Sequence, residues 1–182
     1  MASIALLLAG LLGLLCFVLS AAVIELFRDL RQVRDAMGIL DRALPIEIGD
    51  HKGAEIAELG LPIFLSECAS SVVLFLSDRC STCRILGQSF HGECPQGMAV
   101  VVVPSSNEAG KDFVESYGLV RMAEHGELIL DNEGKVAERL ALKVTPVAYL
   151  FENGKLTSAT TVPSVRFLHS IIPSSVSVSH AA

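Results

Sequence analysis

The sequence has no tryptophan, few aromatic residues and few charged ones. Aromatic residues make up 5% and charged residues 19% of the 182 positions, and 14 Lys and Arg are outnumbered by 20 Asp and Glu, which gives a formal net charge of -6. A chain without a basic tract or many stacking side chains is poorly suited to nucleic acid, so we expect no nucleic-acid partner. A hydrophobic content of 51% excludes a disordered chain, and the length excludes a multidomain enzyme.

Many of the hydrophobic residues are concentrated at the N-terminus. Residues 2–24 contain no charged side chain, and a helix of that length reaches about 34 Å, enough to cross the hydrocarbon core of a membrane. The run is longer than the apolar part of a typical signal peptide, and no Lys or Arg precedes it. We therefore predict a retained single-pass transmembrane anchor over residues 1–24, in preference to a cleaved signal peptide or a buried core helix.

Residues 25–44 are predicted to continue as an amphipathic juxtamembrane helix or stalk, which Pro45 ends. Apolar residues recur there at spacings of three and four, as on one face of a helix. They are Leu26, Leu30, Val33, Met37, Leu40 and Leu44. Two interpretations remain open: a short coiled coil that makes the protein a homodimer through residues 26–44, or a helix that rests on its own domain or on the lipid surface.

Residues 45–172 combine strand and helix patterns. Continuous apolar runs predict strands buried on both faces at residues 72–76, 98–103 and 147–151. Further strands are predicted at 127–130 and 156–162, helices at 80–90, 107–117, 132–140 and 163–172, a short strand or hairpin near 62–66, and a flexible tail at 173–182. Strand, helix and strand within about 35 residues form a βαβ unit, so we expect an α/β fold with a mixed central sheet flanked by helices.

Cys80 and Cys83 lie between a predicted buried strand and a predicted helix, where Cys-x-x-Cys is typical of a redox dithiol. Two intervening residues on a first helical turn let the sulfurs approach each other, and the helix N-terminus favours a thiolate on the leading cysteine. Cys80 is the expected nucleophile and Cys83 the resolving cysteine. Arg79 and Arg84 would favour the Cys80 thiolate and Asp78 would oppose it, and the sequence leaves open which effect dominates.

Other roles for the cysteines are less favourable. Cys80, Cys83, His91 and Cys94 are the residue types that bind zinc, but a helix over 80–90 would hold Cys94 too far from Cys80. No histidine follows Cys83, which excludes covalent haem attachment at the pair. We therefore expect no metal and no cofactor. Cys68 and Cys94 are interpreted as packing residues or bystanders, with a disulfide between them left open.

The dithiol and a later Thr-Pro-strand-turn-strand segment together resemble thioredoxin-fold proteins, specifically the membrane-anchored thioredoxin-like disulfide oxidoreductases of the TlpA type and of the methylamine-utilisation MauD type. The resemblance spans residues 46–172. It implies that Pro146 is cis beside the dithiol, and that the backbone of Thr145 pairs with a substrate chain. The chain departs from the family pattern at Arg79, where an aromatic residue is common, and at Leu74, where a buried acid is common.

The sequence and the resemblance together predict a membrane-tethered thiol–disulfide oxidoreductase, a reductase or isomerase acting on protein cysteines through Cys80 and Cys83, with a role in maturing a disulfide-containing partner. The alternative is a thioredoxin-fold binding or assembly module whose dithiol is slow or vestigial. The direction of electron flow, the client and the electron donor stay open.

Two observations disagree about the side of the membrane on which the domain at residues 45–172 lies. Arginines follow the predicted anchor and none precedes it, which by the positive-inside rule places the domain in the cytoplasm. The flanking charges are Arg28, Arg31, Arg34 and Arg42, mixed with Glu25, Asp29, Asp35 and Asp41. The resemblance implies an extracytoplasmic or periplasmic domain, and we expect that side because the interspersed acids dilute the arginine signal.

Overall fold

The computed structural model describes residues 10, 13, 15–28 and 42–173. The chain divides into two units, Met1–Arg42 and Ala43–Ala182. In the first unit, residues 15–28 are helical. No helix within the described residues is both long enough and apolar enough to span a membrane. Outside the described residues lie 1–9, 11–12 and 14 of the predicted anchor, 29–41 of the predicted stalk, and 174–182 of the predicted tail. The anchor, the stalk and its homodimer therefore stay predictions.

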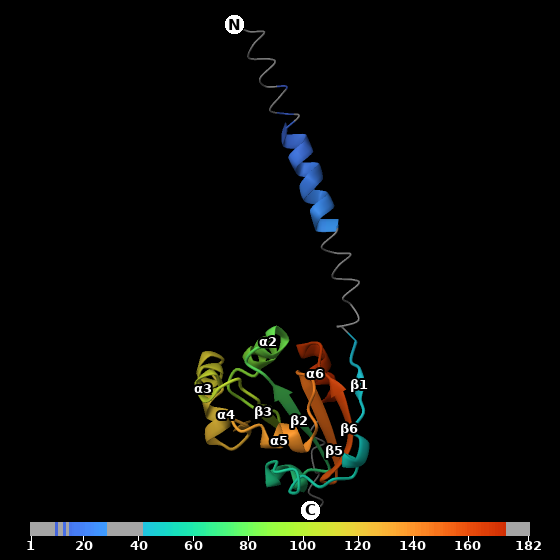
Figure 1. The fold of residues 1–182 in the computed structure, drawn as a ribbon, viewed down its shortest axis with the longest axis vertical. Helices are drawn as coiled ribbons and strands as arrows, with labels where there is room; N and C mark the ends of the chain where they lie inside the picture. The colour runs from blue at the N-terminus through green and yellow to red at the C-terminus, as the bar shows by residue number, and fades with distance from the viewer. Residues whose placement is uncertain (1–9, 11–12, 14, 29–41, 174–182) are drawn as a thin grey trace, which may run out of the picture. The chain divides into compact units, whose positions relative to one another are not determined.

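The second unit is built on a six-stranded mixed sheet with the strand order β1-β6-β5-β2-β3-β4. The strands are β1 (Pro45–Ile46), β2 (Ser70–Leu76), β3 (Met98–Val102), β4 (Leu128–Leu130), β5 (Val147–Glu152) and β6 (Lys155–Thr161). Strands β2, β3 and β4 are parallel, whereas β5 is antiparallel to β2, and β6 is antiparallel to both β5 and β1. The predicted mixed sheet is confirmed, and Figure 1 shows α2 at the arrowhead end of its central strand β2.

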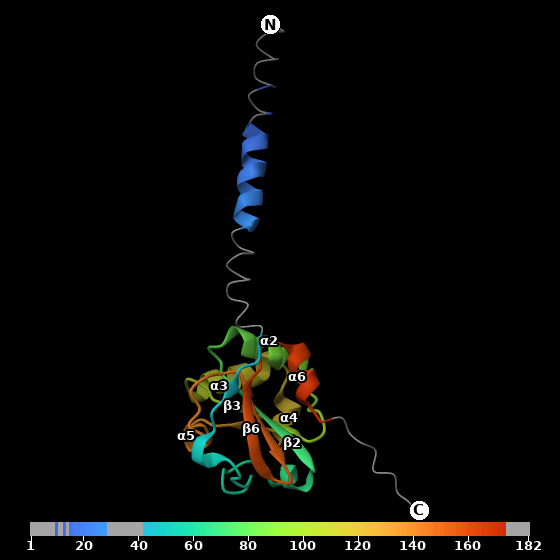
Figure 2. The ribbon, with the colours of Figure 1, turned by 90° about the vertical axis from the view of Figure 1, so that its right-hand side faces the viewer.

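Helices cover both faces of this sheet. They are α2 (Ser81–Ser89), α3 (Asn107–Ser116), α4 (Val120–Glu124), α5 (Lys135–Arg139) and α6 (Val165–Ile171), with 3-10 turns at Gly49–His51 and Ile63–Glu67. One core cluster packs side chains of α2, α3, α4 and α6 against the sheet, and the other packs α5 and residues of the 56–65 segment against the opposite face. Figure 2 shows α4 and α6 on one side of the sheet and α5 on the other.

Strand β2 explains why the sheet needs two covering layers. Its residues from Ser71 to Leu76 are buried, and alternate side chains enter the two core clusters. Leu74 faces the α2 layer, and Phe75 faces the opposite layer, where its ring meets that of Tyr149 edge to face. The continuous apolar pattern of the sequence is therefore that of a central strand buried on both sides.

One predicted element is wrong and two begin later than predicted. The strand or hairpin expected near residues 62–66 is the 3-10 turn Ile63–Glu67, in which the Ser66 hydroxyl donates to the Ile63 carbonyl at 2.6 Å. The helix predicted from 132 begins only at Lys135, because Gly134 has a positive φ of 68° and forms a turn first. The helix predicted from 163 begins after its N-cap Ser164, whose hydroxyl accepts from the Phe167 amide at 3.3 Å. Helix α4 was not predicted.

Candidate active site

The site begins with Cys80, at the point where the loop after β2 enters α2. Cys80 is the N-cap of α2 with an extended backbone, and its sulfur accepts a hydrogen bond from the Cys83 amide at 3.2 Å. The first amides of a helix have no partner within the helix and carry the positive end of its dipole. The Cys80 sulfur therefore lies at the positive end of the α2 dipole, in contact with one of these amides.

Cys83 lies one turn further along, on the inner face of α2. It is fully buried and packs in the same core cluster as Leu74 and Leu86. Burial, together with its hydrogen bond and charge interaction with Cys80, raises the pKa of the Cys83 thiol to about 12. The two sulfurs therefore differ in chemistry: the one at Cys80 is partly accessible, whereas the one at Cys83 is held as a thiol in the core.

Thr145 lies beside Cys80 in the structure, although the two residues are 65 positions apart in the sequence. The Thr145–Pro146 peptide bond is cis, as the resemblance implied. The Cys80 sulfur lies 3.6 Å from the Thr145 carbonyl oxygen, with the thiol as donor. The parts are brought together because β5 begins at Val147, antiparallel to β2, so that its start lies beside the end of β2. Thr145 and Pro146 are both half-buried, and the Thr145 carbonyl borders the Cys80 sulfur.

The three charged residues named from the sequence lie in the same loop and helix, and two of them contact each other. The Arg84 guanidinium donates to the Asp78 backbone carbonyl through Nε at 3.2 Å and Nη2 at 3.0 Å. Arg79 is exposed, and its backbone amide donates to the Ser77 hydroxyl at 3.4 Å. These hydrogen bonds of the two arginines are therefore with Ser77 and Asp78, in the loop that precedes α2.

The Asp78 carboxylate is bound by a residue that the sequence analysis missed. Ser105 donates its backbone amide to Oδ1 at 2.9 Å and its hydroxyl to Oδ2 at 2.6 Å. Partial burial acts to raise the pKa of Asp78, but the hydrogen bonds from Ser105 and the charge of Arg79 outweigh it and hold the pKa below 3.8. The position of Ser105 after β3 was a usable signal, because the carboxyl ends of adjacent parallel strands meet at one edge of a sheet.

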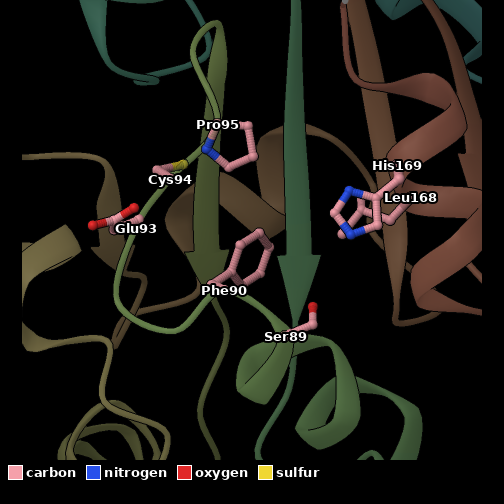
Figure 3. Close-up of a pocket in the computed structure, with 7 residues that line it drawn as sticks. All are labelled: Ser89, Phe90, Glu93, Cys94, Pro95, Leu168 and His169. Atoms are coloured by element: carbon pink, nitrogen blue, oxygen red, sulfur yellow. The ribbon is translucent and has the colours of Figure 1, made fainter.

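Cys68 and Cys94 are partly exposed residues outside the Cys80–Cys83 pair. All five cysteines are free. Burial and the charge of Glu127 raise the pKa of Cys94 to about 12, which favours its thiol form near neutral pH. Cys94 and His169 both line a pocket of about 270 Å³ between the end of α2 and α6, and Figure 3 shows the residues that line it. Within residues 42–173 and the described part of the first unit, no three His, Cys, Asp or Glu residues form a candidate metal cluster.

Comparisons with known proteins find similarity to solved structures alone. No family model matches the chain, and no curated protein matches it. A secreted Mycobacterium tuberculosis disulfide oxidoreductase homologous to E. coli DsbE is 18% identical, covers 51% of this chain and 68% of its own, and gives a TM-score of 0.39. StoA from Bacillus subtilis is also 18% identical, covers 51% and 75%, and gives 0.38. The thioredoxin domain of a thiol-disulfide oxidoreductase from Bacteroides vulgatus is 15% identical, covers 72% and 94%, and gives 0.39.

At such identities and TM-scores these similarities carry no conclusion about activity. The fold itself is defined by the topology: a parallel β2-α2-β3 unit, the antiparallel hairpin of β5 and β6, and a closing helix α6. At the start of α2, the Cys80 sulfur lies 3.6 Å from the carbonyl of Thr145, the residue before the cis proline. The chain therefore has the α/β fold with a mixed sheet that the sequence pattern predicted, with the thioredoxin-like topology that the resemblance implied.

Proposed function

We propose that this chain is a thiol–disulfide oxidoreductase that exchanges electrons with protein cysteines through Cys80 and Cys83. The observation that supports it most directly is the position of the Cys80 sulfur, which accepts the Cys83 amide at 3.2 Å and borders the Thr145 carbonyl at 3.6 Å. A nucleophilic sulfur, a buried resolving thiol and a stretch of backbone for a substrate chain thus lie together. Two cysteines suffice for this chemistry without a cofactor.

In the reducing direction, the Cys80 thiolate attacks a substrate disulfide, forms a mixed disulfide and releases one substrate sulfur as a thiolate. Cys83 then loses its proton to solvent, and its sulfur attacks that of Cys80. The mixed disulfide breaks, the second substrate sulfur leaves, and the Cys80–Cys83 disulfide forms. Two electrons pass to the substrate, and an external dithiol must reduce the pair again. In the oxidising direction the same steps run backward.

The role of Thr145 in this proposal is to hold the substrate chain. Its carbonyl lies beside the attacking sulfur, and an extended peptide that pairs with this backbone would present its own sulfur to Cys80. Pro146 has no amide hydrogen to donate, so the backbone groups of Thr145 are the ones that a substrate peptide would pair with beside Cys80. The substrate class is therefore a cysteine-containing protein segment in extended conformation.

We further propose that residues 2–24 tether the domain to a membrane and that the domain faces an oxidising, extracytoplasmic compartment. The uncharged run of 23 residues supports the tether, and tethering favours a dedicated client at the membrane over bulk turnover. Extraction of membranes at alkaline pH checks the tether, since an anchored chain stays in the pellet. Labelling of Cys80 in intact cells by an impermeant thiol reagent checks the side.

The redox equilibrium of the full chain in detergent tests the proposed activity. Glutathione buffers of graded potential are used, and free thiols are counted by mass. We expect one two-electron transition that disappears in Cys80→Ser and in Cys83→Ser. A potential near roughly −270 mV would indicate a reductase and one near roughly −120 mV an oxidant. Cys80 and Cys83 that stay reduced in every buffer, or that oxidise independently, would refute the proposal.

One observation favours the second candidate, a binding or assembly module with a slow dithiol. Leu74 occupies the buried strand position in the Cys83 cluster, where the family pattern has an acid, and the pKa of Cys83 is raised to about 12. A resolving thiol without a nearby proton acceptor reacts slowly. Full biological function of a chain carrying Cys80→Ser would favour this candidate, whereas loss of function would favour the oxidoreductase.

A further inference from the structure

The Cys80 sulfur is presented by a four-residue loop, Ser77 to Cys80, whose own hydrogen bonds are long. The Cys80 amide donates to the Ser77 carbonyl at 3.3 Å, and the Arg79 amide donates to the Ser77 hydroxyl at 3.4 Å. Bonds of this length lie beyond the usual range for amide donors and contribute little order. The position of the sulfur over the first turn of α2 therefore depends on contacts from outside the loop.

Asp78 supplies those contacts through two different groups. Its carboxylate accepts the amide and hydroxyl of Ser105, 27 residues away, at 2.9 and 2.6 Å. Its backbone carbonyl accepts two hydrogen bonds from the Arg84 guanidinium, at 3.2 and 3.0 Å. Bonds to an ionised carboxylate or from a guanidinium are stronger than neutral ones. One residue thus connects the Cys80 loop to the segment after β3 and to the second turn of α2.

The orientation of the Asp78 carboxylate argues against a role in proton transfer. Its recorded hydrogen bonds within residues 42–173 come from Ser105 and from the Ser77 hydroxyl at 3.4 Å, and neither cysteine sulfur is among the donors. Ionised and bound by several donors, this group is a poor base. Its charge would also disfavour a thiolate at Cys80, so an electrostatic benefit does not explain its place in the loop.

We propose that Asp78 is a positioning residue for Cys80: the carboxylate, held by Ser105, fixes the loop so that the Cys80 sulfur stays aligned with the Cys83 amide and the N-terminus of α2. The inference rests on the proposed function, because it assigns a purpose to the placement of the reactive sulfur. Ser105 is the partner that makes the fixation possible. Arg84 secures the same loop from the helix side.

The test is the rate of alkylation of Cys80 by iodoacetamide at pH 7, followed at that site by peptide mass in the full chain carrying Cys83→Ser. Loss of fixation misaligns the sulfur and reduces its thiolate population. We expect Asp78→Ala and Ser105→Ala to slow alkylation by about three- to tenfold, the effect of losing one ordinary hydrogen bond. Asp78→Asn should restore the rate to within about twofold of the parent, because an amide can accept the Ser105 amide and donate to its hydroxyl.

Ser66→Ala is the matched control. It removes a serine hydroxyl bond of the same length, 2.6 Å, in an exposed turn before the start of β2, whereas the dithiol follows the end of that strand, and it should leave alkylation unchanged. A role through charge alone predicts the opposite sign, with Asp78→Ala and Asp78→Asn both faster than the parent. That result, or a Ser105→Ala rate equal to the parent rate, would overturn the inference.

The two proposals fail separately. If the chain with both cysteines shows no two-electron transition, the oxidoreductase proposal fails, whereas the order of alkylation rates still tests the positioning of Cys80. Thermal unfolding of each variant shows whether it is folded. If Asp78→Ala does not fold, Ser105→Ala decides the question, because it leaves the carboxylate and its charge in place and removes a single donor hydroxyl.

Discussion

The resolving step should depend steeply on pH because Cys83 is buried. Its pKa is raised from 9.0 to about 12, with burial as the largest cause, and burial persists when Cys80 is in a mixed disulfide. A thiol reacts as its thiolate. For a pKa between 9.0 and about 12, the thiolate fraction of Cys83 rises by about 50- to 100-fold between pH 7 and pH 9. Resolution should accelerate by the same factor.

The assay uses a chain in which Cys16, Cys68 and Cys94 are replaced by alanine. Reaction of the reduced dithiol with an aromatic disulfide reagent releases one coloured thiolate when Cys80 attacks and a second when Cys83 resolves. The second phase is recorded by stopped flow from pH 7 to pH 9. Cys83→Ser is the control and should lack that phase.

A second phase that accelerates less than about fivefold over this range would refute the reasoning. It would mean that a neighbouring group accepts the Cys83 proton, although Leu74 occupies the nearby strand position and the Asp78 carboxylate is bound to Ser105. Asp78→Asn then identifies the acceptor, because a rate lowered by this substitution would assign the proton transfer to Asp78.

Two further predictions concern stability. Gly92→Ala should destabilise the fold by about 2–4 kcal/mol in urea unfolding, since its φ is +80° and a Cβ would lie 2.8 Å from the Gly118 carbonyl oxygen. Gly126→Ala is the control: its φ is +74° but the space around it is open, so the substitution should cost about 1 kcal/mol. Equal losses of stability in the two variants would contradict the predicted clash. The reduced protein should also lose stability as pH rises from 9 to 12, because the unfolded chain releases thiol protons that folded Cys83 and Cys94 retain, their pKa values being raised to about 12. Cys94→Ala should flatten this slope, and an unchanged slope would exclude Cys94 as a source.

The strands were predictable because a buried strand is a continuous run of apolar residues in the sequence. β2, β3 and β5 are apolar runs of strand length, and each lies within a residue or two of its predicted place. The short elements were less predictable. Helix α5 and the turn Ile63–Glu67 are each five residues long, and segments of that length carry too little periodicity to distinguish turn, helix and strand.

The local sequence motifs of the candidate site were predictable, whereas the contacts between distant segments were not. Cys-x-x-Cys before a helix and Thr-Pro before a strand are local patterns, and the structure brings them to 3.6 Å of each other. The place of Ser105 after β3 indicates the sheet edge at which it lies, but its pairing with Asp78 depends on the register of two parallel strands, which the sequence does not give. That Arg84 favours the Cys80 thiolate stays a prediction, and only the structure shows that its guanidinium is bound to a loop carbonyl.

The sequence by itself determined the strand and helix pattern, the dithiol at the start of a helix and the apolar N-terminal run, since each follows from residues close together in the chain. Only the tertiary structure decided that Cys83 is buried, that Thr145 borders the Cys80 sulfur and that Ser105 holds Asp78. These facts set the reactivity of each sulfur. They depend on which segments, 27 to 65 residues apart, the sheet places side by side.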